Sequence, residues 1–540
     1  MAKSSNSSFI SIITVFFFWG FLAASNGIFI PFCKTHFSLS QFQSQLIDSA
    51  FFGAYFIGSL VLYMISLKLN TDIINKIGYK TTIILGLVIS IVGALVMIPA
   101  IGSGSFPFIL IAFFIIALGF SLQQTSANPL ILNLGNPATG SHRLNFAGSI
   151  NSFGTTIGPI LVSVLLFGKV IAGDADKETA SISSITILYI ILAIAFGVAA
   201  VILYFTKINK LTIEDEEENA TMKVLKAPLQ AICAFLGLVI VLFLCSAVNA
   251  YSSASSSFLF LIGITFFLII AFSLLVVQYK TIKTQNKFET KSYPQVILGM
   301  AAVFVYVGVE VAIQSNLGAL LKLPQFGGLQ TSQIGAYISI YWGSLMIGRW
   351  TGSIGAFKLN KTMTIALTII IPFLAFALVL FMNYLNGVAP HQFYMYALCV
   401  AFLVGAFFLG KQKPALTLII FSSLGTLAML IGLLTVGNLS VFAFLSGGLF
   451  CSIMWPCIFS LAIAGLGKYT SQASSFLIMM IVGGAVIPPL QGYLADKTSL
   501  HTSYIIPVFC FAFLTWYAFK VKHILKLKGI DYDANNDVAH

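Results

Sequence analysis

The amino-acid sequence is dominated by apolar stretches of about 18 residues or more, which recur from one end of the chain to the other. Each stretch is long enough to cross about 30 Å of hydrocarbon as an α-helix. Helices are expected because a backbone in lipid must satisfy its hydrogen bonds internally. Charged residues make up only 8% of the chain, against roughly a quarter in soluble domains. The sequence therefore predicts an all-α membrane protein.

The breaks between apolar stretches predict about 16 membrane spans, with boundaries approximate to a few residues. Six spans are expected in the first part of the chain and two more after a polar stretch that begins near residue 206. Eight are expected in the last part. The predicted ranges are 9–32, 42–66, 81–101, 106–132, 145–168, 183–205, 228–250, 257–278, 294–321, 334–357, 363–385, 391–410, 413–435, 438–464, 473–493 and 502–521.

The distribution of basic residues predicts the orientation of the chain. Lys and Arg occur mostly in alternate short loops, as expected for loops on the cytoplasmic side. Both termini are therefore expected in the cytoplasm of a cell with a bacterial-type inner membrane. The net charge of +12 is explained by these loops, so no nucleic-acid partner is expected. The first apolar run is too long for the core of a signal peptide.

The two parts of the chain carry similar small-residue patterns. Gly53 and Gly58 in the second span have the same spacing as Gly343 and Gly348 in the second part. Weak internal symmetry of this kind is typical of transporters that place their substrate site between two repeats. Small residues at such spacings also allow close helix packing, which is the structural alternative.

Two carboxylates, Asp48 and Glu310, lie well inside apolar spans. A carboxylate near the bilayer centre costs at least about 2.5 kcal/mol and is therefore expected to face a cavity. Either residue could bind a coupling proton or cation, or accept hydrogen bonds from solute hydroxyls. Alternatively, neighbouring helices could satisfy these carboxylates in a purely structural role.

Amide side chains and aromatic rings accumulate near the deep carboxylates. Amides pair with hydroxyl groups, and an aromatic face covers the C–H face of a sugar ring, so we predict a polyhydroxyl solute. Hydrogen bonding between helices is the alternative role for each amide. The predicted substrate-binding residues are Asn26, Gln123, Gln124, Asn128, Asn151, Gln314, Asn316 and Trp455.

The sequence shows no arrangement of residues that indicates an enzyme. The histidines form no metal-ligand pairs, the seven cysteines form no metal-ligand cluster, and no nucleotide-binding loop of the Gly-x4-Gly-Lys type occurs. We therefore expect neither catalysis nor a metal or organic cofactor, apart from a possible coupling H⁺ or Na⁺.

Several motifs resemble sugar transporters of the major facilitator superfamily, in the fucose and glucose/galactose proton-symporter family. The resemblance covers all twelve core spans. Its motifs are Phe17-Phe18-Trp19-Gly20, Gln124-Thr125-Ser126-Ala127-Asn128-Pro129, Asn151-Ser152-Phe153-Gly154, Tyr306-Val307-Gly308-Val309-Glu310, Gly348-Arg349 and Ser452-Ile453-Met454-Trp455-Pro456. It implies two six-helix bundles that alternate access to a central sugar site. It also implies gating roles for Asp72, Lys80, Arg143 and Arg349.

This chain departs from the family pattern in two respects. Gly27 and Gln124 stand where the fucose-symporter pattern has acidic residues, and Gly148 replaces a glutamine, whereas Asn151 is retained. Glu310, with Asp48, is therefore our candidate for ion coupling. The second departure is about four extra spans, in two pairs.

The expected organisation is an N-terminal six-helix bundle at 1–206 and a linker with an inserted hairpin at 207–292. A C-terminal six-helix bundle at 293–530 contains a second inserted hairpin at 363–410, and a tail follows at 531–540. The predicted function is cation-coupled transport of a small sugar (a hexose such as glucose or galactose, or fucose) by a monomer. Without a coupling group the protein could instead be a uniporter, and sodium could replace the proton. Transport of another small polar solute, such as an amino sugar or nucleoside, is the alternative. A membrane sensor is a further, different class.

Overall fold

The computed structural model describes residues 9–22, 37, 41–69, 72–134, 139–167, 182–206, 293–329, 331–357, 359–385, 387–411 and 413–530. Every regular element in these ranges is helical, as the hydropathy pattern predicts. The predicted hairpin at 228–278 and the tail at 531–540 lie outside the described residues.

The helices before residue 206 form the N-terminal part. Their ends follow local sequence signals: Pro107 lies in the first turn of one helix, and Gly104 takes a φ of +68° in the turn before it. The helices are Phe9–Leu22, α2 (Gln41–Leu69), α3 (Ile73–Ile77), α4 (Tyr79–Gly102), α5 (Phe106–Asn133), α6 (Gly140–Phe167) and α8 (Ile182–Phe205).

The C-terminal part contains α11 (Pro294–Leu321), α12 (Thr331–Gly352), α13 (Lys361–Leu385), α14 (Ala397–Gly410), α15 (Pro414–Leu434), α16 (Gly437–Cys451), α17 (Met454–Ala462), α18 (Thr470–Met479), α19 (Gly483–Lys497) and α20 (Ile505–Leu527). Short 3-10 turns join them at Pro324–Phe326, Ile354–Ala356, Pro390–Tyr396, Gly467–Tyr469, Met480–Val482 and Thr502–Tyr504. Two long spans are interrupted, one between α16 and α17 and the other between α18 and α19.

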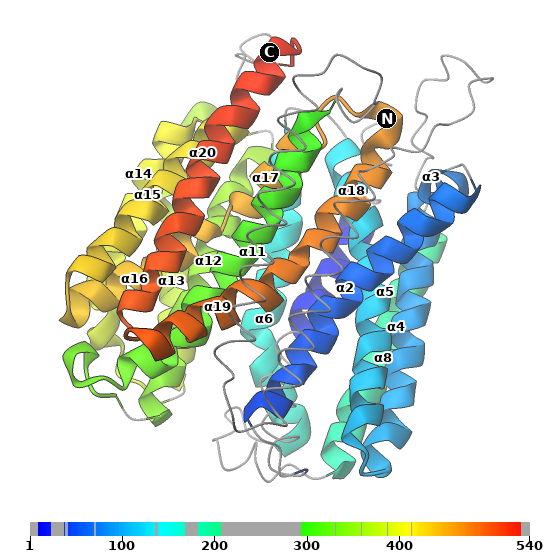
Figure 1. The fold of residues 1–540 in the computed structure, drawn as a ribbon, viewed down its shortest axis with the longest axis horizontal. Helices are drawn as coiled ribbons and strands as arrows, with labels where there is room; N and C mark the ends of the chain where they lie inside the picture. Colours follow the sequence, from blue (N-terminus) through cyan, green and yellow to red (C-terminus); the bar gives the residue numbers. More distant parts are fainter. Residues whose placement is uncertain are drawn as a thin grey trace. The chain divides into compact units, whose positions relative to one another are not determined.

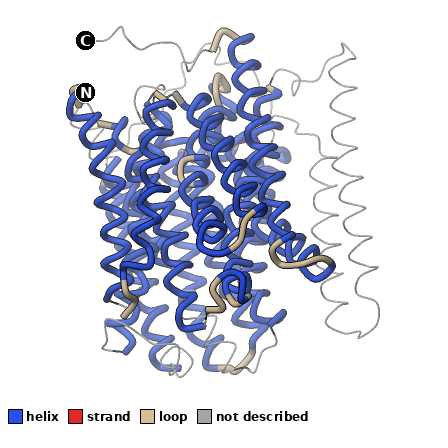
Figure 2. The backbone as a smooth tube through the Cα atoms, turned by 90° about the vertical axis from the view of Figure 1, so that its left-hand side faces the viewer, coloured by secondary structure: helices blue, strands red, loops and turns tan. Residues whose placement is uncertain are grey.

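Ten helices among the described residues are long and apolar enough to cross a membrane. Two shorter apolar helical segments add to them: Phe9–Leu22, and Ala50–Ser66 within α2. Figure 2 shows the described elements as helices joined by loops. These described helices correspond to 14 of the 16 predicted ranges, since 438–464 and 473–493 each contain a helix break.

Helix packing repeats between the two parts. In the first part, α2 packs on α5 and α4 packs on α8; in the second, α12 packs on α16 and α15 packs on α20. Gly58 of α2 lies against Ser121 of α5, and Gly348 of α12 lies against Ser452 at the end of α16. A Cβ at either glycine would collide with the facing serine, so both glycines are needed for close approach.

The helices α13 and α14 lie between α12 and α15 in the sequence and have no counterpart in the packing of the first part. In the structure, α13 packs on α12, and α14 packs on α15 and α16. These two spans are less buried than any other candidate span, since only 22% and 33% of the residues in their most apolar 18-residue segments are buried by protein.

The N-terminal and C-terminal helices meet along two contacts, which we call the bundle seam. One contact joins α6 to α12 and α17, and the other joins α18 to α2 and α5. In Figure 1, α18 (orange) runs beside α2 (blue). Residues far apart in the sequence therefore meet at the seam.

Candidate functional site

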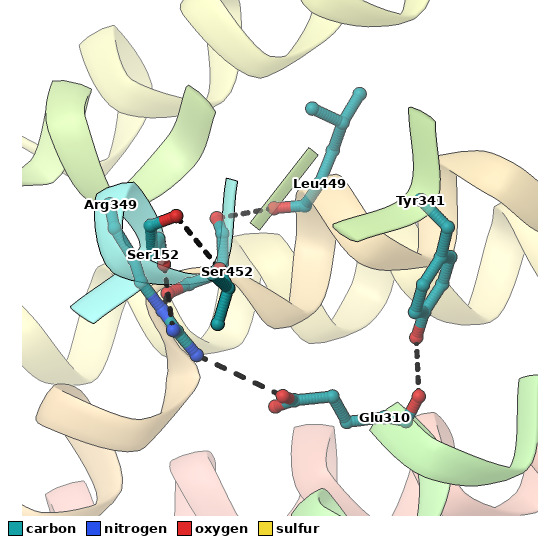
Figure 3. Close-up of polar contacts among 7 residues, drawn as sticks. Ser152, Glu310, Tyr341, Arg349, Leu449 and Ser452 are labelled. Carbon is teal, nitrogen blue, oxygen red and sulfur yellow. Dashed lines mark hydrogen bonds and ion pairs between the residues drawn. The ribbon is translucent and has the colours of Figure 1, made fainter. Parts of the chain in front are cut away.

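Glu310 and Arg349 form an ion pair beside the bundle seam. Glu310 lies in the middle of α11, and its Oε1 atom is 3.9 Å from Nη2 of Arg349 on α12. The two side chains are only 14% and 15% exposed. Figure 3 shows the guanidinium pointing toward the carboxylate. Each charge offsets part of the desolvation cost of the other.

Aromatic residues surround the ion pair. The Tyr341 hydroxyl donates a hydrogen bond of 2.7 Å to the main-chain oxygen of Glu310, and Tyr306 lies one helical turn before Glu310 on α11. The Tyr306 ring contacts Trp455, with 6.3 Å between ring centroids. The predicted aromatic residue Trp455 therefore lies close to the predicted carboxylate Glu310, through Tyr306.

Arg349 also connects the two parts of the chain. Its Nη1 atom donates a hydrogen bond of 2.9 Å to Oγ of Ser152 on α6, across the bundle seam. Its Nε atom donates to the main-chain oxygen of Ser452 at 3.3 Å. A single guanidinium thus contacts a carboxylate in its own half and a hydroxyl in the other half.

Asp72 is at a second seam contact. It caps α3, accepting hydrogen bonds from the backbone of Ile74 at 2.9 Å and Asn75 at 3.3 Å. Its other oxygen accepts a hydrogen bond from Ser471 on α18. Burial raises the pKa of the Asp72 carboxyl, and the hydrogen bond from Ser471 opposes this change. Asp72 therefore couples a helix cap in one half to a helix start in the other.

We call the side of the molecule where Asp72 lies the Asp72 end. Further hydrogen bonds cross the seam toward this end: His142 to the Gly352 oxygen at 3.0 Å, Trp350 to the Ser149 oxygen at 3.3 Å, and Ser474 to the Thr125 oxygen at 2.8 Å. Among the described residues, the hydrogen bonds across the seam extend from this end to the bond from Arg349 to Ser152 and the bond from Thr156 to the sulfur of Met346. The two halves are therefore closed against each other at the Asp72 end.

Lys80 and Arg143 bind helix ends within the N-terminal part. Lys80 donates to the main-chain oxygens of Tyr204 and Thr206 at 2.8 Å, at the end of α8. Arg143 donates to the oxygens of Ile131 and Leu132 at the end of α5. A cation at a helix C-terminus satisfies unpaired carbonyls and interacts favourably with the helix dipole.

Three of the predicted substrate-binding amides in the N-terminal part are hydrogen-bonded to protein groups. Gln123 accepts a bond of 2.7 Å from the Trp19 indole and donates one of 3.1 Å to Ser90. Gln124 donates to the Tyr55 hydroxyl at 2.9 Å, and Asn151 donates to the Phe16 oxygen at 3.1 Å. Gln123 is fully buried, whereas Gln124 and Asn151 keep partial exposure.

Asn128 differs from the other amides. It is 1% exposed, and neither polar atom of its side chain has a hydrogen-bond partner. An unpaired buried amide is costly, so it requires a physical explanation. On α11, Asn316 donates to the Ala312 oxygen at 3.2 Å, and Gln314 is half-buried.

Comparison with known proteins agrees with this architecture. Residues 9–253 match the family model described as Major Facilitator Superfamily. The chain is 30% identical to a putative glucose/galactose transporter of Helicobacter pylori (strain J99), over 96% of this chain and 98% of the relative. It is 28% identical to a glucose/galactose transporter of Brucella abortus biovar 1, over 94% and 92%.

This chain belongs to the Major Facilitator Superfamily.

A solved structure of a superfamily transporter, FucP in the outward conformation, shares the fold. The TM-score is 0.64 at 23% identity, with 96% of this chain and 99% of that chain covered. A curated relative with 24% identity over 94% of this chain is the L-fucose-proton symporter of Escherichia coli (strain K12). Membership establishes a multi-pass membrane transporter fold and not an enzyme fold.

Two of the predicted site residues cannot be placed in this superfamily fold. Asn26 lies outside the described residues. Asp48 belongs to α2, but its side chain is outside the described ones. Gly148, which replaces a glutamine of the fucose-symporter pattern, lies beside Arg349: a Cβ there would be in ordinary van der Waals contact, 3.5 Å from Cδ of Arg349.

The structure adds partners that the sequence reasoning did not single out. Ser152, Tyr341 and Ser471 are hydroxyl residues in apolar helices, and they contact Arg349, Glu310 and Asp72 respectively. Serine is common in membrane helices because it permits close packing, so its occurrence alone marks no site. No signal in the sequence distinguishes these three hydroxyl residues from others in the same helices.

Proposed function

We propose that this protein carries a small sugar across the cytoplasmic membrane by alternating access, and that proton binding to Glu310 drives accumulation. The observation that carries this proposal is the position of the Glu310–Arg349 pair. It places a deep carboxylate next to the cation that hydrogen-bonds across the bundle seam. A change of charge on Glu310 therefore acts directly on a contact between the two halves.

The coupling follows from electrostatics. An ionised Glu310 attracts and orients Arg349, which can then donate to Ser152 on the opposite helix. When Glu310 takes up a proton, this attraction is lost and the hydrogen bond across the seam weakens. Proton binding therefore favours separation of the halves at the Asp72 end, which is the end closed in this structure.

Arg349 also favours a proton over sodium. A sodium ion needs several oxygen ligands, and a guanidinium 3.9 Å from the carboxylate would repel it. A proton needs only one carboxylate oxygen and leaves the guanidinium in place.

The proposed sugar site lies among the amides and rings near the seam. Gln124, Asn128 and Asn151 contribute from the N-terminal part, and Trp455 and Gln314 from the C-terminal part. Asn128 has unused hydrogen-bonding capacity that a sugar hydroxyl would satisfy. The names of the two relatives described above make glucose and galactose the first substrates to test.

The proposed organisation keeps the predicted boundaries: a bundle at 1–206, a linker with a hairpin at 207–292, and a second bundle at 293–530. The hairpin 363–410 is proposed as an insertion because α15 packs on α20 as α4 packs on α8. We propose that both termini and the Asp72 end are cytoplasmic, following the basic loops. We propose a monomer, because both contacts of the bundle seam are formed within one chain.

Uptake by proteoliposomes tests the function. Labelled glucose, galactose and fucose are offered under an imposed proton gradient, and separately under a sodium gradient. Accumulation of one sugar under the proton gradient alone is expected. Exchange without accumulation would contradict coupling, and sodium-driven accumulation would contradict the choice of ion. If no sugar moves while a control transporter is active, amino sugars and nucleosides become the candidates.

A further inference from the structure

A cavity of about 240 Å³ lies next to the inserted hairpin, and neither Glu310 nor Arg349 lines it. Its wall combines both parts of the chain: the first turns of α6, the end of α12, the start of α13, the end of α14, the start of α15 and the break before α17. The cavity borders the bundle seam, since His142 and Gly352 of its lining form one of the hydrogen bonds across that seam.

One residue of the cavity wall carries an unsatisfied buried acceptor. Asn145 of α6 lines it and is only 4% exposed, and its Oδ1 atom has no hydrogen-bond partner. A buried carbonyl oxygen without a donor costs free energy that a donor entering the cavity would recover. The occupant should therefore carry a hydroxyl or ammonium group.

The rim of the cavity provides a positive charge. Lys411 lines it, is exposed, and takes a left-handed backbone conformation with φ of +48°, at the end of α14. The hydroxyls of Thr364 and Thr368 are already bonded to carbonyls of their own helix. The occupant should therefore place an anionic group near Lys411.

The depth and surroundings of the cavity indicate a lipid. Its deepest residue on α13, Thr368, is seven residues from the helix start at Lys361, or about 10 Å along the axis. That is close to the headgroup layer of a bilayer. The lining side chains Ile365 and Phe408 are each 42% exposed on the two spans least covered by protein.

We infer that this cavity binds the headgroup of a phospholipid that carries both a phosphate and a hydrogen-bond donor. The phosphate pairs with Lys411, and the glycerol hydroxyl or ethanolamine ammonium donates to Asn145. Basic pockets between membrane helices bind acidic lipid headgroups by the same chemistry. Phosphatidylcholine has the phosphate but no donor, and should bind more weakly.

Binding is tested by native mass spectrometry of the full-length protein with phosphatidylglycerol, phosphatidylethanolamine and phosphatidylcholine of equal acyl chains. Retention of the first two should exceed that of phosphatidylcholine about tenfold, as expected for one additional hydrogen bond. Lys411→Gln should lower the retention of all three lipids, because the phosphate is common to them. Asn145→Leu and the cavity-filling Thr368→Phe should each abolish the difference. Lys520→Gln, a charge change equal to that of Lys411→Gln at an exposed site on α20 outside the cavity lining, should do neither.

Equal retention of all three lipids, or preferential retention that survives both cavity variants, would overturn the inference. Displacement by millimolar glycerol phosphate would assign the cavity to a soluble anion and overturn the choice of a lipid. Thermal unfolding of each variant, measured in parallel, confirms that it is folded. Asn145→Leu offers a second route to the same loss if Thr368→Phe fails to fold.

A consequence for transport rests on the proposed function. Because the cavity has walls from both halves, an occupant should stabilise the closed Asp72 end. Sugar uptake should then differ between liposomes with and without phosphatidylglycerol, and Lys411→Gln should remove the difference. This result is distinguishable from failure of the proposed function, since lipid retention is measured without any sugar.

Discussion

Nη1 of Arg349 lies 2.9 Å from Oγ of Ser152, although 197 positions separate the two residues in the sequence. The same guanidinium lies 3.9 Å from the carboxylate of Glu310 in its own half. The contact between the halves is therefore placed one side chain away from a buried titratable group. This arrangement is the physical basis of the coupling proposed above.

Replacement of Glu310 should separate accumulation from exchange. Glu310→Gln keeps the shape and the hydrogen-bonding capacity but cannot carry a charge. We expect at least about tenfold less proton-driven accumulation, with sugar exchange retained, in proteoliposomes. Asp496→Asn, an equal change at an exposed carboxylate, is the control and should accumulate normally. Full accumulation by Glu310→Gln would exclude this residue as the coupling site.

The hydrogen bond between Arg349 and Ser152 should contribute to closure of the Asp72 end. Ser152→Ala removes the acceptor and should weaken closure by about 1.5–3 kcal/mol, the usual range for a bond to a charged group. Accessibility of a cysteine introduced at Ser474 on the seam, probed with a soluble maleimide, measures the effect. In an Arg349→Gln background, Ser152→Ala should have little further effect. Additive effects would show that the two residues act independently.

Asp72 should make stability depend on pH. Its pKa is raised in the folded state by burial, so the folded protein holds a proton that the unfolded chain releases. This contribution is complete below the ordinary carboxyl pKa of 3.8 and is lost as the pH rises through the raised value. Thermal unfolding from pH 4 upward should show a decline in Tm that Asp72→Asn reduces. An identical pH profile in the variant would contradict the prediction.

Gly348 should tolerate no side chain. A Cβ at this position would collide with the side chain of Ser452, and such overpacking typically costs about 1–3 kcal/mol. Gly348→Ala should therefore lower Tm. Gly335→Ala on the same helix is the matched control, because no atom lies within 4 Å of its added Cβ. Equal Tm values for the two variants would mean that the helices separate easily.

Asn128 distinguishes a substrate contact from a structural amide. Because both of its polar atoms lack partners, Asn128→Leu should not lower Tm, and removal of the unpaired amide should stabilise by about 1 kcal/mol or more. Sugar affinity should fall about tenfold if a hydroxyl bonds to this amide. The apparent affinity for uptake and the Tm are measured on the same preparation. A lower Tm with unchanged affinity would assign Asn128 to structure.

The apolar stretches alone determined that the chain is an all-α membrane protein, and they located its described spans. The reason is that hydrocarbon imposes one length and one backbone conformation on any spanning segment. Glu310 could also be selected from the sequence, because the cost of a charge in lipid depends on its depth in a span.

Only the tertiary structure decided which groups meet. Ser152, Tyr341 and Ser471 are unremarkable in an apolar helix, and their contacts with Arg349, Glu310 and Asp72 depend on how the helices are rotated and paired. Likewise, Gln123 and Asn128 are both amides on α5, but packing satisfies the first and leaves the second without a partner. Hydropathy predicts how deep in the membrane a residue lies. It does not predict which residues of a neighbouring helix will face it, so these roles could be assigned only from the tertiary structure.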